Sequence, residues 1–224
     1  NFWKSVRSMY KIKPDYINLE SGYYNMLPEE TLNNYLSIIK EVNYHASFYM
    51  RTRQFKERAA QNKLIAQFLG GTEEEIVLTR NTTESLDLII SGYPWNKGDE
   101  AIFAEQDYGA MIDMFKQVAK RHGVVNKMVS VPNIPKSDEE IVGIYEKAIT
   151  KKTKLIMLCH IINITGQILP IKKICDMAHK YGVEVMVDGA HAVAQIQFSI
   201  KELGCDYYGS SLHKWLAVPL GVGV

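Results

Sequence analysis

The fold is decided by two apolar runs, Leu155-Ile156-Met157-Leu158 and Val183-Glu184-Val185-Met186-Val187, and by the segment that joins them. Short apolar runs rich in branched residues are typical of strands buried on both faces. The joining segment places Ile171, Ile174 and Ala178 on one face of a helix. A strand, a helix and a second strand in this order form the repeating unit of a parallel sheet.

The same alternation extends toward the N-terminus. Short strands are predicted at 76–78 and 101–103, each followed by a helix, the second of which stops at Gly123. A further helix begins at Ser137, where Glu140 three residues later completes a capping box. We therefore expect an α/β fold with a mainly parallel sheet.

The residues before Gly71 follow a different pattern. Pro28 opens one helix, and a second helix ends at Gly70-Gly71, where glycine permits a left-handed conformation. We expect a helical N-terminal lead-in over residues 1–70 and one continuous domain over residues 71–224. Both ends of the chain look cut, because the first residue is Asn1 and the last five residues resemble the beginning of a strand. Because the chain does not begin with methionine, an export signal upstream of Asn1 is an open alternative.

Composition narrows the class of partner. The 224 residues include 26 Lys and Arg against 25 Asp and Glu, so the net charge of +1 gives no reason to expect nucleic acid or an anionic membrane as a partner. No apolar run reaches the roughly 18 residues that a membrane-spanning helix needs. The three cysteines show no CxxC spacing, which fits a reducing compartment and a cytoplasmic location.

Ligands of open α/β sheets bind at the carboxyl ends of the strands, so the polar residues there are the candidate site. The first group follows Leu78, where Asn81 can cap a helix and Glu84 can reach back to the backbone. The free N–H groups and the Thr82 and Thr83 hydroxyls of such a helix start suit a phosphate. A well-capped surface helix without a ligand is the alternative.

Two further groups follow the strands at 155–158 and 183–187. Asp188 emerges where burial without a partner is costly, and His191 follows it across a Gly189-Ala190 turn. A carboxylate there can hold a protonated ring nitrogen, a metal ion or a ribose, or it can simply cap a helix beside a core histidine. Asn163 could donate to a ligand, although asparagine in a loop is more often part of a turn.

The last group contains Lys214, which is crowded by His213 and Trp215. Partial desolvation would lower the pKa of this lysine and free its amine to attack an aldehyde. Ser211 and His213 can add hydrogen bonds to a phosphate. An ordinary surface lysine is the alternative. The histidines and Cys159 do not lie at short metal-ligand spacing, so we expect no metal site.

The combination is more specific than any one group. A phosphate-ready helix start, a strand-end aspartate and a lysine 26 residues after it are the parts that pyridoxal phosphate needs. The phosphate would bind the helix start, the pyridinium would pair with the carboxylate, and the aldehyde would form a Schiff base with Lys214.

These residues closely resemble the class V aminotransferase family of fold-type I pyridoxal-phosphate enzymes. That family includes cysteine desulfurases, kynureninase and isopenicillin N epimerase-like proteins. The matching stretches span most of the chain in family order: Thr79–Glu84, His160–Gly166, Val187–His191 and Ser210–Trp215. The epimerase-like branch is suggested by Leu216 after the last stretch, by Asp107–Ala110, and by Asn18–Tyr24, which is similar to that branch's substrate-facing segment.

The resemblance implies a role for each site residue. Lys214 would carry the cofactor as an internal aldimine and move the substrate Cα proton, and Asp188 would pair with the ring nitrogen. His191 and Asn163 would lie near the phenolic oxygen of the ring. Tyr108 would stack on the ring, unless it only fills the core. The phosphate would be bound by Thr82, Thr83, Ser211 and His213.

The resemblance also implies a three-layer α/β/α large domain, a homodimer and an amino acid as the small-molecule substrate. Family members usually end in a small α/β domain, which this chain lacks, and in desulfurases that region carries the catalytic cysteine. We therefore expect an aminotransferase or epimerase-like enzyme, with a cysteine desulfurase or other C–S lyase as the alternative. A non-catalytic binding or assembly protein with this fold is a second alternative, although Lys214 and Asp188 are both present. A dinucleotide-binding domain is weaker still, because no Gly-x-Gly-x-x-Gly follows the first strand.

Overall fold

The structure is a computed structural model that describes residues 1–13 and 15–224. Helices precede, cover and connect the strands of one sheet, and a short 3₁₀ helix lies at Glu73–Glu75. The helices are α1 (Phe2–Ser8), α2 (Glu29–Thr52), α3 (Gln54–Leu69), α4 (Thr82–Gly92), α5 (Gly109–His122), α6 (Asp138–Ala148), α7 (Ile171–Lys180) and α8 (Ile200–Leu203). The strands are β1 (Glu100–Ala104), β2 (Val125–Val129), β3 (Thr153–Cys159), β4 (Glu184–Asp188) and β5 (Tyr207–Gly209).

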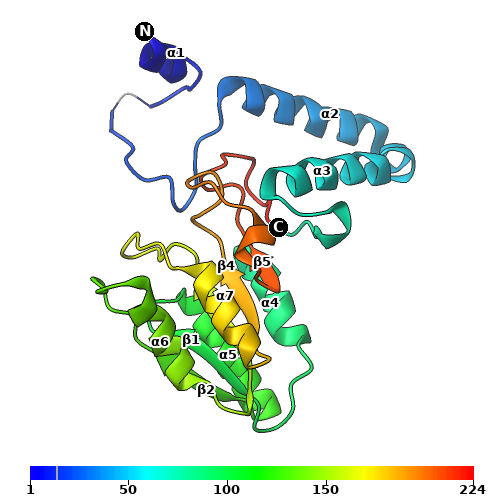
Figure 1. The fold of residues 1–224 in the computed structure, drawn as a ribbon. Helices are drawn as coiled ribbons and strands as arrows, with labels where there is room; N and C mark the ends of the chain where they lie inside the picture. The colour runs from blue at the N-terminus through cyan, green and yellow to red at the C-terminus, as the bar shows by residue number, and fades with distance from the viewer. Residues whose placement is uncertain (14) are drawn as a thin grey trace.

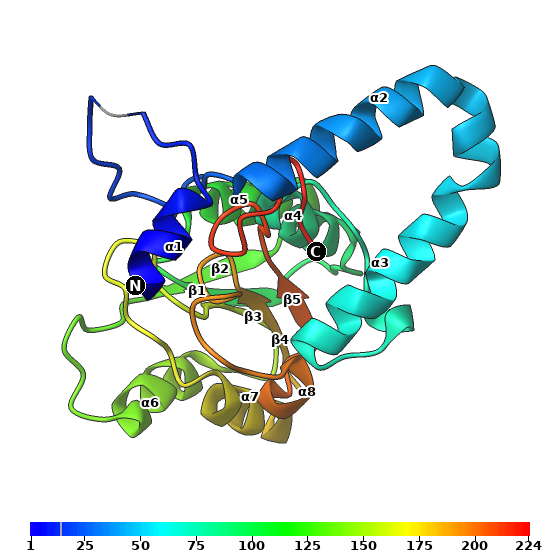
Figure 2. The ribbon, with the colours of Figure 1, turned by 90° about the horizontal axis from the view of Figure 1, so that it is seen from above.

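The sheet has the order β2-β1-β3-β4-β5, and every neighbouring pair of strands is parallel. In Figure 2 the sheet lies between α4 and α5 on one face and α6, α7 and α8 on the other. The predicted three-layer α/β/α architecture is therefore confirmed.

Two apolar cores hold the layers together, one on each face of the sheet. Because successive side chains of a strand point to opposite faces, β3 serves both cores. Ile156 and Leu158 pack toward α6 and α7, whereas Leu155 and Met157 pack toward α4 and α5. These four side chains are fully buried, and burial of each contributes about 1.5–3 kcal/mol.

The strand predicted at 76–78 is wrong. Ile76 is buried but Val77 is 65% exposed, and pairing in this region is limited to a single antiparallel bridge between Thr79 and Gly223. Conversely, β2 was not predicted, because Asn126 and Lys127 interrupt the apolar residues of this edge strand.

Two helix starts differ in detail from the predicted capping. Asn81 caps α4 as expected, with its side chain accepting from Glu84 N at 2.8 Å, but the Glu84 carboxylate reaches back to Arg80 N. Ser137 precedes α6 without a side-chain capping bond, and Glu140 bonds to Lys136 N. In both cases the glutamate reaches one residue further back than the cap.

The last residues of the chain pair with the segment that leads to Lys214. Ser210 and Val224 exchange two backbone hydrogen bonds, and Gly223 forms antiparallel bridges to both Thr79 and Ser211. A Cβ at Gly223 would lie 2.6 Å from the Asn81 backbone, so only glycine allows this close approach. The pairing holds the start of α4 beside the lysine-bearing segment.

The N-terminal helices stand apart from the sheet. In Figure 1, α2 and α3 lie side by side above it as an arm. The end of α1 contacts the start of α2, where Glu29 N donates a hydrogen bond to Met9 O at 2.7 Å. α3 is anchored through Ala66 and Leu69, which pack with Val193 and Leu212. No helix in the described part of the chain is long and apolar enough to cross a membrane.

Candidate active site

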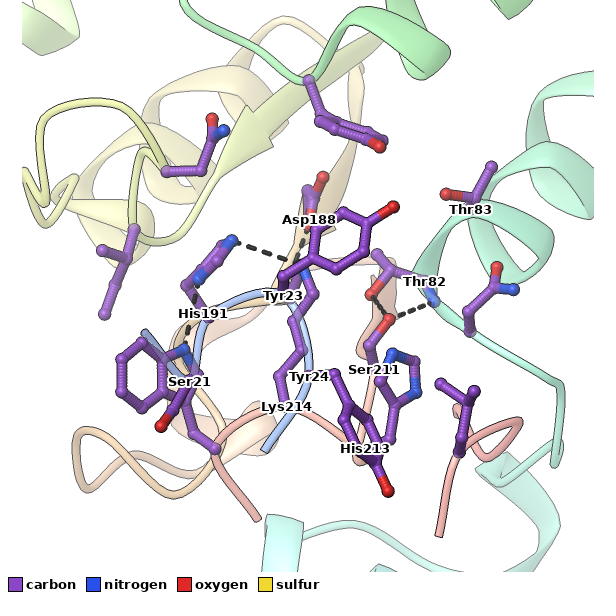
Figure 3. Close-up of a pocket in the computed structure, with 18 of the residues that line it drawn as sticks. Ser21, Tyr23, Tyr24, Thr82, Thr83, Asp188, His191, Ser211, His213 and Lys214 are labelled. Carbon is purple, nitrogen blue, oxygen red and sulfur yellow. Dashed lines mark hydrogen bonds between the residues drawn. The ribbon is translucent and has the colours of Figure 1, made fainter. Parts of the chain in front are cut away.

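A cavity of about 900 Å³ opens at the carboxyl ends of β3 and β4. Its walls come from the start of α4, the strand ends, the segment after β5 and the N-terminal stretch from Leu19 to Tyr24. All nine site residues predicted from the sequence line it: Thr82, Thr83, Tyr108, Asn163, Asp188, His191, Ser211, His213 and Lys214. Figure 3 shows Lys214 extending toward Asp188 and His191, with Thr82 and Ser211 on its other side.

Lys214 is half-buried, and its Nζ lies 3.3 Å from His191 Nε2. Burial lowers the pKa of the Lys214 amine, and the nearby Asp188 and Glu20 carboxylates offset part of that shift. A lysine of this kind gives up its proton more readily than a surface lysine. Lys214 thus lies in the cavity and not on the open surface.

Asp188 ends β4 and is only 5% exposed. Burial raises the pKa of its carboxyl, while a hydrogen bond from Ala190 N at 3.0 Å and the charge of Lys214 lower it. Within the described residues this is the one hydrogen bond to the carboxylate, so it can accept a further donor from the cavity. Gly189 is required here, because a Cβ would lie 2.1 Å from the Tyr208 ring that packs beneath the turn.

His191 contacts two other side chains, those of Lys214 and Trp215. Its Nδ1 accepts a hydrogen bond from Trp215 Nε1 at 3.1 Å, and its Nε2 faces Lys214. Burial, and then the charge of Lys214, lower the pKa of His191 to about 4, so the ring is neutral at neutral pH. The predicted approach of Asp188 and His191 to one cavity is confirmed, and His191 is not a core histidine.

The start of α4 forms a cradle for an anion. Thr82 N and Thr82 Oγ1 lie 2.8 and 2.7 Å from Ser211 Oγ, and Glu84 N bonds to Asn81. The Thr83 N–H between them has no acceptor in the described structure. A free helix N–H and two hydroxyls at one point suit a phosphate.

His213 lies beside this cradle with its Nδ1 3.4 Å from Val222 O. That contact requires a proton on Nδ1, so Nε2 of the neutral ring is an acceptor. Burial lowers the pKa of His213, and a bound dianion would raise it again. Direct donation from His213 Nε2 to a phosphate therefore requires the protonated ring.

Two predicted residues lie toward the rim of the cavity. Tyr108 precedes α5 and is 45% exposed, so it does not fill the core. Asn163 is exposed in the turn between Ile161 and Ile168, which are joined by an antiparallel bridge. Their positions leave both side chains able to contact a ligand in the cavity.

Some features of the site were not found from the sequence. The hydrogen bond from Trp215 to His191 joins residues 24 positions apart, and no local pattern signals it. Cys159, expected in the core, is 3% exposed and yet also lines the cavity. Elsewhere, His160 contacts Tyr208 and Phe198, and no group of His, Cys, Asp or Glu in the described residues is arranged to hold a metal ion.

The cavity fits pyridoxal phosphate. The molecule presents a phosphate, a ring nitrogen and an aldehyde on one flat ring, which call for an anion site, a carboxylate and an amine. The start of α4, the buried Asp188 and the half-buried Lys214 supply them within one cavity. The incompletely bonded Asp188 carboxylate and the free Thr83 N–H are the groups that such a ligand would satisfy.

Comparison with known proteins gives matches over most of the chain. The family model described as aminotransferase class-V matches residues 26–224. Isopenicillin N epimerase of Streptomyces clavuligerus is 27% identical over 99% of this chain and 56% of that protein. A probable cysteine desulfurase of Halalkalibacterium halodurans is 32% identical over 74% of this chain and 40% of that protein.

Solved structures give the same fold. A variant of C-DES with glycine covalently linked to its PLP cofactor superposes with a TM-score of 0.86 at 24% identity, over 94% of this chain and 56% of that one. The chain thus spans about half the length of these relatives.

Proposed function

Because the chain belongs to the class-V aminotransferase family, we propose that it binds pyridoxal 5′-phosphate on Lys214 and acts at the Cα of an amino-acid substrate. The observation that carries the proposal is the convergence of Lys214, Asp188 and the start of α4 on one cavity. These segments are separated by up to 132 positions in the chain, from Thr82 to Lys214, so their meeting is a property of the fold.

Each residue would have one task in holding the cofactor. Thr82, Thr83 and Ser211 would bind the phosphate, with His213 joining them when protonated. Asp188 would accept a hydrogen bond from the ring nitrogen and keep it charged. Tyr108 would cover the ring, and His191 and Asn163 would contact its phenolic oxygen.

The cofactor, when bound, supplies an electron sink that weakens the bonds at the substrate Cα. Lys214 would attach the aldehyde by condensation, with its nitrogen bonding to the aldehyde carbon and the carbonyl oxygen leaving as water. The Lys214 amine, when not bonded to the cofactor, would remove or return a proton at the substrate Cα. Burial lowers the pKa of Lys214 and so favours the neutral amine that both tasks require.

The aminotransferase or epimerase-like activity is supported by the epimerase relative, whose similarity extends over 99% of this chain. Cysteine desulfurase activity is the alternative, and the desulfurase relative keeps it open. The cysteines of this chain give it no support, because burial raises the pKa of Cys159, Cys175 and Cys205. A persulfide-forming nucleophile needs an accessible thiolate.

A homodimer is part of the proposal. The N-terminal arm exposes large apolar side chains, including Tyr44 at 84%, Phe48 at 66% and Phe55 at 64%. Exposed aromatic residues in this number are typical of a surface that is covered in the assembled protein.

Titration of the intact protein with pyridoxal phosphate tests the proposal. The protein should develop a visible band near about 410–430 nm, as a lysine-linked cofactor does. Lys214→Ala should abolish the band, whereas Lys116→Ala should keep it, because Lys116 lies on the surface paired with Asp113. An unchanged band in Lys214→Ala, or no band in the parent protein, would refute the proposal.

A further inference from the structure

We propose that Trp215 is a positioning residue of this site. Its indole N–H fixes His191 in the tautomer that carries its proton on Nε2, and that proton holds the Lys214 amine in its neutral form. The role of these contacts in catalysis rests on the proposed function, whereas the contacts themselves are present without the cofactor.

The hydrogen bond from Trp215 determines the tautomer. An indole N–H can only donate, so His191 Nδ1 at 3.1 Å must be the acceptor and carries no proton. The His191 ring is neutral, because burial lowers its pKa to about 4. A neutral imidazole has one N–H, which therefore lies on Nε2.

The tautomer in turn favours the neutral form of Lys214. Its Nζ lies 3.3 Å from His191 Nε2, and an ammonium group has three donors and no lone pair. Two donors facing each other would not form a hydrogen bond. The contact is a hydrogen bond only if the lysine is a neutral amine that accepts from Nε2–H.

The other groups around Lys214 favour the opposite state. Burial opposes the ammonium form of Lys214, whereas Asp188, Glu20 and Cys159 favour it. Without the indole N–H, His191 is free to move its proton to Nδ1 and to present Nε2 as an acceptor. An ammonium would then be favoured, so removal of the indole donor should raise the pKa of Lys214.

The first test measures the tautomer in the cofactor-free intact protein by ¹⁵N NMR of labelled histidine. The His191 signal, assigned by its loss in His191→Ala, should show a proton on Nε2. In Trp215→Phe, which keeps an aromatic ring but loses the donor, the signal should move toward the Nδ1–H form. A proton on Nδ1 in the parent protein would overturn the proposal, and so would an unchanged signal in Trp215→Phe.

The second test measures the pH dependence of the rate of cofactor uptake, which follows the neutral fraction of Lys214. Trp215→Phe should shift the profile upward by about half a pH unit, or about threefold in rate below the midpoint. Trp95→Phe is the matched control, because it removes an indole N–H bonded to Ile90 O outside the cavity, and it should shift nothing.

The His191→Ala background separates positioning from packing. If Trp215 acts through His191, the shift caused by Trp215→Phe disappears in that background. A shift that persists there would overturn the proposal in favour of a packing effect. Absence of uptake by the parent protein would instead contradict the proposed function, and the NMR measurement would still test the tautomer.

Discussion

Two histidines lie beyond the ends of neighbouring strands, and the structure gives them different environments. His160 directly follows β3, and His191 lies three residues beyond β4. Burial lowers the pKa of both to about 4. His160 is enclosed by Tyr208 and Phe198, with its Nδ1 3.0 Å from the Tyr208 hydroxyl, whereas His191 faces the cavity and Lys214. A shifted pKa alone therefore does not mark a functional residue.

The same contrast holds for two buried carboxyls. Burial raises the pKa of Asp107 and of Asp188. Asp107 lies beneath the surface with Oδ2 accepting from Ala104 N at 2.7 Å, and its Oδ1 has no partner in the described structure. Asp188 lines the cavity. We therefore expect substitutions of the enclosed residues, His160 and Asp107, to alter stability. Substitutions of the cavity residues, His191 and Asp188, should alter ligand binding.

The largest effect is expected for Asp188→Asn. Loss of a charged hydrogen bond to the ring nitrogen should weaken cofactor binding by several hundredfold, or about 3–4 kcal/mol. The melting temperature of the cofactor-free protein should stay the same or rise, because a buried carboxylate is removed. Absorbance titration and thermal melting measure the two quantities. A large loss of stability with unchanged affinity for the cofactor would instead show that Asp188 has a structural role like that of Asp107.

His160→Ala and His191→Ala form the next comparison. His160→Ala should lower the free energy of unfolding by about 2–3 kcal/mol, because it leaves a cavity and removes the partner of the Tyr208 hydroxyl. His191→Ala should change it by less than about 1 kcal/mol but weaken cofactor binding by about tenfold. Urea unfolding and absorbance titration of both variants would show whether the two effects separate in this way.

A smaller effect is expected from Asp107. The pKa of this carboxyl is raised to about 7 in the folded protein, from an ordinary value of 3.8, so the folded state holds a proton that the unfolded state releases. Stability should therefore fall as the pH rises from about 4 to 7. Asp107→Asn should flatten that fall and stabilise the protein by about 1–2 kcal/mol at pH 8. Equal pH slopes in parent and variant would contradict this.

The sequence predicted the central strands because they are buried on both faces. β1, β3 and β4 lie within two residues of the predicted runs. β2 is an edge strand, and its polar residues gave it no apolar run by which to predict it. The apolar segment at 76–78 does not form a strand. In the described structure the pairing near it is a single bridge, which joins the following residue, Thr79, to Gly223.

The candidate site was predictable because parallel strands bring their carboxyl ends to one edge of the sheet. Position after an apolar strand does not separate His191 from His160, because both follow such strands; the family resemblance selected His191. Which one faces the cavity depends on Tyr208, which lies beneath the Gly189 turn and binds the His160 ring. The contact between Trp215 and His191 likewise depends on side-chain directions that only the packed structure fixes.

Reduction of the cofactor-loaded intact protein with borohydride, followed by proteolysis and mass spectrometry, tests most directly whether these segments meet around one ring. A pyridoxyl group is expected on the peptide that contains Lys214. Labelling of a different lysine, or labelling spread over many lysines, would contradict it.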